Sequence, residues 1–458
     1  MDFGNSFYAG TQQSMSAAPR TAKQNGPVPF QLRWAPPTIA AVSAGRRLRN
    51  RAQHPPMTVR YRVYPRPMGR HVGQAIASER KIAGLSQVQL AGRARYSLSM
   101  VKAVEQGREV ASPGFVAAVS KALGVDPDRL QGTPYVESLE EDGPLEGLGD
   151  LRAVMAEGTY VQPLEAPSET QSASQLSVVE AALRGDKTRR ALAMLPTLIR
   201  QLHGAIQTSS GPARVRAYEM LCGAYIAAEC ACCRLGYSSL TALVLDRLDW
   251  VAAHTDDPGY AVRSLMKRSR LLMSHGSTDV AISLIDRGLR LVPGESENER
   301  VLRGYGHLRG AIVAARGRRL DVAQDHIAAA RRIAKPMSRE SDLYTTDFGP
   351  GNVEIHACAV ELEAGDPGKA ATYGAALQLP ADMAAPRAGH HWQDNARAWL
   401  MAGKPDKALI ALNKARIAAP QQTRLHPSVR ETLHGIASAQ RRQQDSLLGF
   451  ASWLGTSL

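Results

Sequence analysis

The sequence predicts an all-α protein with two kinds of helical region. Short segments with helical spacing and serine caps fill residues 69–132, and helical segments separated by Gly or Pro breaks run from Leu176 to the end. No stretch of useful length alternates apolar and polar residues with the period of two that a strand requires. A chain of 458 residues is also too long for one compact core, so two or three domains are expected.

The first segment, residues 1–68, is basic, rich in Pro, Gly, Ser, Gln and Arg, and without sustained periodicity. Its only acidic residue is Asp2, in a chain whose formal net charge is +14. This composition predicts a disordered basic arm, and the positive balance fits contact with nucleic acid or an anionic surface. Two interpretations stay open: the arm binds a nucleic-acid backbone, or translation begins at Met57 or Met68 and the preceding residues are upstream sequence.

The charge changes sign after the short-helix region. Residues 133–175 are rich in Gly, Pro and Ser. Between Glu137 and Glu169 there are many acidic residues and only one Arg. This stretch is predicted to be an acidic linker with one short helix near Leu151 to Glu157. The domains expected are therefore the arm 1–68, a helical domain 69–132, the linker 133–175 and a helical domain 176–458.

Several classes of protein are disfavoured by what the chain lacks. There is no apolar run of signal-peptide or membrane-spanning length, and five Cys in a large chain are typical of reduced thiols, so a soluble cytoplasmic protein is expected. No nucleophile-elbow, zincin or P-loop motif is present, so neither an enzyme nor a cofactor is expected. The cluster "CACC" has no second ligand pair nearby, so no metal is expected and packing between helices is preferred over metal binding or redox sensing. The Ala, Arg, Gly and Pro bias indicates a GC-rich bacterial genome.

The stretch "GLSQVQLAGRARYSLSMVKAVEQGR" predicts two short helices joined by a tight turn. Ser86 stands at the N-cap of the first helix and Ser97 at that of the second. Gly107 ends the second helix, as a left-handed residue does, and Ser112-Pro113 begins another helix that stops at Gly124. The small Ala91 lets the two helices cross at a steep angle.

This pattern resembles the helix-turn-helix of the phage-repressor, or Cro/CI-type, family, also called the xenobiotic response element family. The resemblance covers about sixty residues, counting the stretch "EQGREVASPGFVAAVSKALGVDPDRL", and predicts a five-helix domain. Arg95 departs from the family, which usually has Gly at the turn, so a positive φ is expected there. The motif residues are Gln87, Leu90, Ala91, Ala94, Tyr96, Val101 and Val104.

The resemblance implies that the helix Ser97–Gln106 lies in the major groove of double-stranded DNA. It also implies that Gln87 contacts a phosphate and that Arg80 and Glu105, at the family's paired positions, form a structural ion pair. A small helical bundle with polar surfaces is the alternative. The predicted DNA-binding residues are Gln87, Ser97, Leu98, Ser99, Lys102, Ala103 and Gln106.

The last two-thirds of the chain resemble a tetratricopeptide repeat array, with a generic helical bundle as the alternative. The segment from Gln393 to Pro420 gives the clearest copy, in which small residues let two helices approach and large ones fill the gaps. Weaker copies precede it, with breaks at Gly276, Gly317 and Gly365. The matching positions are Trp392, Ala396, Trp399, Gly403, Ala408, Leu412, Ala415 and Pro420.

The first helix of each such hairpin lines the concave face, where peptides or partner helices bind. The register predicts a ligand surface there whose cationic members suit an anionic ligand or a peptide carboxylate. For each residue a solvated surface role is the alternative, and for Asn352 helix capping is preferred. The predicted ligand residues are Arg263, Arg270, His307, Asn352, His390, Gln393 and Arg397, with Met266 and Ile355 beside them.

The layout as a whole is similar to bacterial transcription regulators in which a repeat domain senses a small peptide and dimerises. The sequence therefore predicts a homodimeric, sequence-specific DNA-binding regulator with a peptide or small-molecule effector and no membrane association. A protein-interaction scaffold whose repeats bind a partner is the alternative from another class. A repeat protein that modulates an enzyme, and that does not bind DNA, is a third.

Overall fold

The computed structural model describes residues 71–133, 144–439 and 445–456. Within these ranges the regular elements are helices, and the one β-type pairing is an isolated bridge between Ser341 and Phe348. The predicted all-α class is confirmed. The predicted arm, residues 1–68, lies outside the described residues. No helix in the described part of the chain is both long enough and apolar enough to cross a membrane.

The first described domain contains five short helices. Ser86, Ser97 and Ser112 cap α2, α3 and α4 by accepting hydrogen bonds from backbone N–H groups of the following turn. The buried side chains of this domain form a core of their own, centred on Phe115 and Leu90. The helices are α1 (Val72–Ile82), α2 (Gln87–Ala94), α3 (Leu98–Glu105), α4 (Pro113–Leu123) and α5 (Pro127–Gln131).

In the stretch predicted as a linker, 133–175, the short helix expected near Leu151 to Glu157 is present, but it is packed into the second helical domain. The helix α6 (Leu148–Glu157) packs against α8 and α10, and α7 begins at Glu169 behind the cap Ser168. Although this stretch is acidic, α6 has an apolar face with helical spacing. That face is buried in the same core as α8. That face consists of Leu148, Leu151, Val154 and Met155. The second helical domain therefore starts earlier than residue 176.

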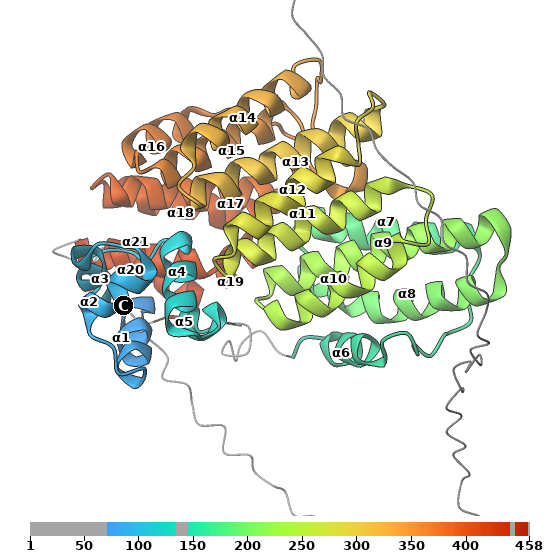
Figure 1. Ribbon diagram of the computed structural model, residues 1–458, viewed down its shortest axis with the longest axis horizontal. Coiled ribbons are helices and arrows are strands. Elements are labelled where there is room, and N and C mark those ends of the chain that lie inside the picture. The colour runs from blue at the N-terminus through green and yellow to red at the C-terminus, as the bar shows by residue number, and fades with distance from the viewer. Residues whose placement is uncertain (1–70, 134–143, 440–444, 457–458) are drawn as a thin grey trace, which may run out of the picture. The chain divides into compact units, whose positions relative to one another are not determined.

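From α7 to α18, consecutive helices pack in pairs as hairpins, which Figure 1 shows side by side from α11 onward, and further helices follow. The helices are α7 (Glu169–Arg184), α8 (Thr188–Thr208), α9 (Gly211–Arg234), α10 (Ser238–Ala252), α11 (Pro258–Ser274), α12 (Thr278–Arg290), α13 (Glu297–Arg316), α14 (Leu320–Ala334), α15 (Pro350–Ala364), α16 (Pro367–Ala376), α17 (Ala385–Met401), α18 (Pro405–Ala418), α19 (Pro420–Leu425), α20 (Pro427–Ala439) and α21 (Asp445–Leu454).

Small residues explain why the two helices of a hairpin approach so closely. In the pair α17–α18, Ala396, Ala408 and Ala415 are fully buried at the contact. Gly403 provides the left-handed turn between the two helices, with φ of 71°. This is the packing expected of a tetratricopeptide-like array, and the predicted helical solenoid is confirmed.

The first helix of each hairpin is here called the A helix; the A helices are α7, α9, α11, α13, α15 and α17. Each A helix contacts the next one along the chain, and α17 also contacts α7. A second contact joins the same two ends of the array. The Asp186 carboxylate accepts hydrogen bonds from the backbone N–H of Gln421, at 2.6 Å, and of Gln422, at 3.1 Å.

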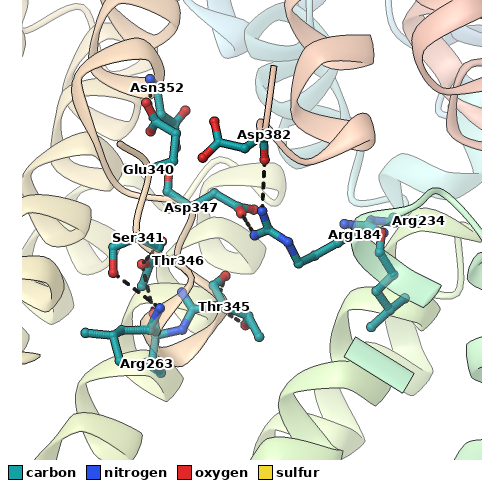
Figure 2. Close-up of polar contacts among 12 residues, drawn as sticks. Arg184, Arg234, Arg263, Glu340, Ser341, Thr345, Thr346, Asp347, Asn352 and Asp382 are labelled. Atoms are coloured by element: carbon teal, nitrogen blue, oxygen red, sulfur yellow. Dashed lines mark hydrogen bonds and ion pairs between the residues drawn. The ribbon is translucent and has the colours of Figure 1, made fainter. Parts of the chain in front are cut away.

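An irregular loop, 335–349, separates α14 from α15. It is held by its Phe348 ring, which is fully buried against Gly304 of α13; a Cβ at Gly304 would lie 2.1 Å from the ring. The loop backbone is left-handed at Tyr344, Thr345 and Asp347. Figure 2 shows how polar contacts fix this loop: Arg184 of α7 forms an ion pair with Asp347 and donates a hydrogen bond to the carbonyl oxygen of Asp382.

Candidate nucleic-acid interface and repeat surface

The turn between α2 and α3 has the geometry of a helix-turn-helix. Arg95 occupies the left-handed region with φ of 56° and ψ of 40°, which is the positive φ expected at this turn. The backbone N–H of Tyr96 donates to the Ala91 carbonyl at 3.1 Å, so the turn closes directly over the end of α2. A non-glycine residue in this conformation costs about 1–2 kcal/mol, which the surrounding packing must offset.

Helix α3 presents one buried and one exposed face. Val101 and Val104 are fully buried in the domain core, and Ser97 caps the helix by accepting from the Met100 N–H. The predicted DNA-binding residues lie away from this buried side. Of these, Ser97, Ser99, Lys102 and Gln106 are exposed, and Leu98 and Ala103 are half-buried. The exposed face can donate hydrogen bonds to base edges or phosphates.

The structure places Arg80 and Glu105 in contact. Arg80 Nε lies 2.6 Å from Glu105 Oε1, and both side chains are largely buried, so α3 is tied to α1 by a charged pair that is shielded from solvent. The hydrogen bond to Glu105 raises the pKa of Arg80. Gln87 joins the pair, because its side-chain amide donates to Glu105 Oε2 at 2.8 Å. Gln87 therefore positions α3 through Glu105 in addition to any phosphate contact.

Three exposed arginines beside the motif were not predicted as site residues. Arg93 and Arg95 lie at the end of α2 and in the turn, and Arg108 follows α3. Long cationic side chains at such positions suit phosphate contacts, which orient a protein on DNA without reading its sequence. The signal was present in the sequence as basic residues flanking both ends of the predicted second helix.

The predicted ligand residues of the repeat domain do not form one surface. Arg270 contacts Glu229 and Cys233, and Gln393 is buried, donating to Thr423 at 3.1 Å. Arg397 is also buried, and its guanidinium donates to Glu363 at 2.9 Å. These three side chains join neighbouring helices rather than facing a common space.

His307 and Asn352 form polar contacts within their own part of the array, and Met266 and Ile355 are buried. His307 Nδ1 lies 2.9 Å from His326 Nδ1 of α14, on the side of α13 that faces its own hairpin partner. Asn352 is buried in the first turn of α15 and donates to the Asp347 carbonyl at 2.6 Å. Met266 and Ile355 are buried apolar side chains.

Arg263 and His390 remain, and each lies close to residues that were not predicted. The Arg263 guanidinium lies 4.4 Å from the centre of the Tyr305 ring, and Arg309 lies 5.4 Å from the same ring. His390 is one helical turn after Arg387 on α17. The repeat register predicted that His307 of α13 lies on the ligand surface. In the structure, Tyr305 and Arg309 of α13 are the residues that lie on the side of the neighbouring A helices.

The cysteine cluster lies within the packed helix α9. Cys222 and Cys232 are buried, and burial raises the pKa of both thiols. Cys230 Sγ lies 3.2 Å from Lys267 Nζ, and Cys233 contacts Arg270. Both cations also contact Glu229, which is almost fully buried. The cluster is therefore part of a polar contact between α9 and α11.

A family model described as a helix-turn-helix domain matches residues 44–131. The chain therefore contains a helix-turn-helix domain, which supports a DNA-binding regulator. The match begins at residue 44, within the segment predicted as a basic arm, and its residues before 71 lie outside the described part of the chain. No curated protein matches the chain significantly.

Solved structures show only distant similarity. Bacillus thuringiensis PlcR in complex with the peptide PapR7 and DNA is 11% identical, with 82% of this chain and 100% of that chain covered and a TM-score of 0.31. The PrgX/iCF10 complex is 9% identical, with coverages of 84% and 96% and a TM-score of 0.29. The P58(IPK) TPR domain is 14% identical, with coverages of 80% and 99% and a TM-score of 0.21.

Proposed function

We propose that the chain is a bacterial, cytoplasmic transcriptional regulator that binds specific DNA sequences through α3. We further propose that its helix-turn-helix is of the Cro/CI type, that the protein acts as a homodimer without enzymatic activity, and that its repeat domain serves dimerisation and senses a peptide or small ligand. The observation that carries the proposal is the arrangement of α3, whose exposed side bears Ser99 and Lys102 while its other side is anchored in the core.

Recognition of bases requires a helix that is both exposed and rigidly placed. The exposed side of α3 supplies a hydroxyl and an ammonium group, which can bond to base edges in the major groove. The Arg80–Glu105 pair and the Gln87 amide hold the C-terminal end of α3 against α1 and α2. Loss of this anchor would misplace the reading residues even though none of the three reads a base itself.

The homodimer follows from the geometry of operators. One short helix reads only a few base pairs, so regulators of this type bind two half-sites about one helical turn apart. A repeat domain that pairs two chains would set that spacing, and a ligand that changes the pairing would change DNA affinity. By linkage, such a ligand binds the DNA-bound and free states with affinities that differ by about 1–3 kcal/mol.

The experiment is a selection of genomic fragments bound by the full chain, followed by binding measurements on the selected site. Specific affinity of roughly 10⁻⁸ M or tighter is expected. The double variant S99A/K102A should lose most of the preference for the selected site over unrelated DNA. The matched control is S78A/K81A on α1, which removes the same groups away from α3 and should keep that preference.

Two outcomes would contradict the proposal. If no sequence is enriched, the chain is better described as an interaction scaffold whose repeats bind a partner protein. If S99A/K102A weakens binding to all sequences equally, Ser99 and Lys102 contact the backbone and do not read bases. Sedimentation of the full chain with and without the selected site tests the dimer, because a monomer bound to a single half-site would exclude it.

A further inference from the structure

Two arginines from neighbouring A helices lie against one tyrosine, and a third, from another A helix, acts on it electrostatically. They are Arg263 of α11, Arg309 of α13 and Arg387 of α17, here called the arginine cluster. Arg263 and Arg309 lie 4.4 Å and 5.4 Å from the centre of the Tyr305 ring. The charge of Arg387 acts on the same group, since it interacts with both Tyr305 and Arg309. A buried histidine, His356 of α15, adjoins Arg309 at 3.4 Å.

The cluster has too few acidic partners. Arg263 is almost fully buried, yet its contacts are the carbonyl oxygen and hydroxyl of Thr345, each at 3.3 Å (Figure 2). The Arg387 backbone N–H donates to the Ala384 carbonyl oxygen at 2.8 Å, but its guanidinium has no hydrogen bond or ion pair with any residue that the structure describes. The Nε atom of each of the three arginines is buried and, within the described ranges, has no hydrogen-bond partner. Buried cationic donors of this kind normally have an acceptor.

The carboxylates in the neighbourhood already have other partners. Asp347 forms an ion pair with Arg184, as Figure 2 shows. Asp394 lies 3.9 Å from His390, but burial lowers the pKa of His390 to about 4, so this neutral ring does not cancel the charge of Asp394. Glu229 contacts Lys267, the other cation whose charge acts on Tyr305. The charges of Asp394 and Asp347 favour the charged form of Arg387, but burial and the charge of Arg309 outweigh them, so these acids offset the positive charge of the cluster only in part.

His356 cannot supply negative charge and does not add positive charge. Its Nδ1 lies 2.8 Å from the Asn352 carbonyl oxygen, so Nδ1 carries the hydrogen and Nε2 accepts from Arg309. Burial and the charges of Arg387 and Arg309 hold its pKa well below the ordinary value, which keeps the ring neutral.

Two further groups respond to the excess positive charge. Burial and the nearby charge of Arg309 lower the pKa of Arg387 to about 10. Burial disfavours the phenolate of Tyr305, but the charges of Arg263, Arg309 and Lys267 outweigh it and lower its pKa to about 8. The environment thus favours an anion at this position strongly enough to promote ionisation of a tyrosine.

We propose that Arg309 and Arg387 bind an oxyanion group of a ligand, a carboxylate or a phosphate, next to Tyr305, with Arg263 supporting them from α11. Arginine presents paired N–H groups that match both kinds of oxyanion. The proposal deepens the sensing role proposed above by naming the chemistry of the effector, and its regulatory meaning rests on that function. A bound oxyanion would join α13 to α17 and so affect how the hairpins between them stack.

The test uses the full chain and two probes, succinate and inorganic phosphate, titrated calorimetrically at neutral pH with sodium chloride held at matched ionic strength. Saturable binding of at least one probe at millimolar concentration is expected. The variant R309Q/R387Q should weaken it at least about tenfold, because each lost charge-assisted hydrogen bond is worth more than a neutral one. The control R287Q/R290Q removes the same charge from exposed positions on α12 and should bind like the wild type.

A second measurement reports on the site even if the double variant folds poorly. The difference in phenolate absorbance between the wild type and Y305F isolates the titration of Tyr305, which should occur near pH 8. A saturating probe should move this titration toward the ordinary value of 10, since it neutralises the surrounding charge.

The two probes distinguish the source of the oxyanion: tighter binding of succinate indicates a carboxylate ligand, and tighter binding of phosphate indicates a phosphorylated one. The proposal is overturned if neither probe binds or moves the Tyr305 titration, or if R309Q/R387Q binds as the control does. DNA binding measured on the same preparation separates this failure from failure of the proposed function. A chain that binds its selected site but no oxyanion would refute the ligand site alone.

Discussion

The helix-turn-helix domain and the repeat domain differ in how many charged groups they bury. In the helix-turn-helix domain an apolar core is joined by a largely buried ion pair, Arg80 with Glu105, and Ser99 and Lys102 of α3 are exposed. In the repeat domain charged groups are buried between hairpins, among them Glu229 with Lys267 and Arg397 with Glu363. The function proposed for the first region therefore depends on which residues are exposed. The function proposed for the second depends on which buried charges lack a partner.

The largest expected effect comes from breaking a buried pair in the repeat domain. Glu229 is almost fully buried and contacts both Lys267 and Arg270. The variant E229Q leaves these cations without an anionic partner, which should lower the free energy of unfolding by about 3–5 kcal/mol. Urea denaturation of the full chain, followed by circular dichroism, measures the change.

The matched control lies in the same part of the array. Arg268 Nη2 lies 2.9 Å from Asp246 Oδ1, but the Asp246 side chain is 61% exposed. The variant D246N should therefore cost less than about 1 kcal/mol. Equal losses for D246N and E229Q would show that burial does not set the strength of these pairs.

Low pH should remove the stabilisation by the Glu229 carboxylate without a mutation, because it protonates this group. Burial raises the pKa of Glu229, but Lys267 and Arg270 outweigh this and bring it to about 2, below the ordinary 4.5. Because the folded pKa is depressed, the stabilisation is fully present above about pH 4.5 and is lost as the pH falls toward 2. The difference in unfolding free energy between the wild type and E229Q, measured from neutral to acid pH, should shrink across this window. A constant difference would contradict the assignment.

A smaller change in stability is expected when a glycine in each region is replaced by alanine. A Cβ at Gly304 of α13 would lie 2.1 Å from the buried Phe348 ring, whereas a Cβ at Gly92 of α2 would have nothing within 4 Å. The variant G304A should destabilise the chain by about 1–3 kcal/mol through overpacking. In G92A the better helix propensity of Ala should stabilise by about 0.5–1 kcal/mol. Thermal unfolding of both variants checks that the signs differ.

The smallest effect is expected at the turn before α3. Arg95 has φ of 56°, a conformation that Gly adopts without strain. The variant R95G should raise the free energy of unfolding by about 0.5–1 kcal/mol, since the relief of strain exceeds the added backbone entropy of the unfolded chain. Unchanged or lower stability would show that packing of the Arg95 side chain outweighs its backbone strain.

These contrasts also explain which features could be predicted from sequence. The caps at Ser86, Ser97 and Ser112 and the turn at Arg95 depend on a few neighbouring residues, so local pattern was sufficient for the first domain. The short helix at α6 was predicted, but its buried apolar face was not, because the acidic residues around it dominate the composition of this stretch. Its helical spacing was nevertheless present in the sequence.

Which repeat residues lie between the hairpins depends on contacts between segments that are far apart in the sequence. Which side of α13 faces α11 and which faces α14 is settled by the packing of three helices, and a shift of two residues separates His307, paired with His326, from Arg309. Similarly, Arg387 on α17 has no ion pair of its own among the described residues, because Asp347, forty residues earlier in the chain, is paired with Arg184 and acts on Arg387 only through its charge. No short sequence window contains this information.

The contact between Asp186 and the N–H groups of Gln421 and Gln422 has a consequence for how the repeats fold. A solenoid whose repeats touch only their neighbours can fray from its ends, one hairpin after another, and can assemble as it is synthesised. Here the first hairpin cannot make this contact until α19 has emerged from the ribosome, more than two hundred residues later. Once made, it suppresses fraying at both ends together. The array should therefore lose its helices in one cooperative transition, and a cut in any single hairpin should weaken them all.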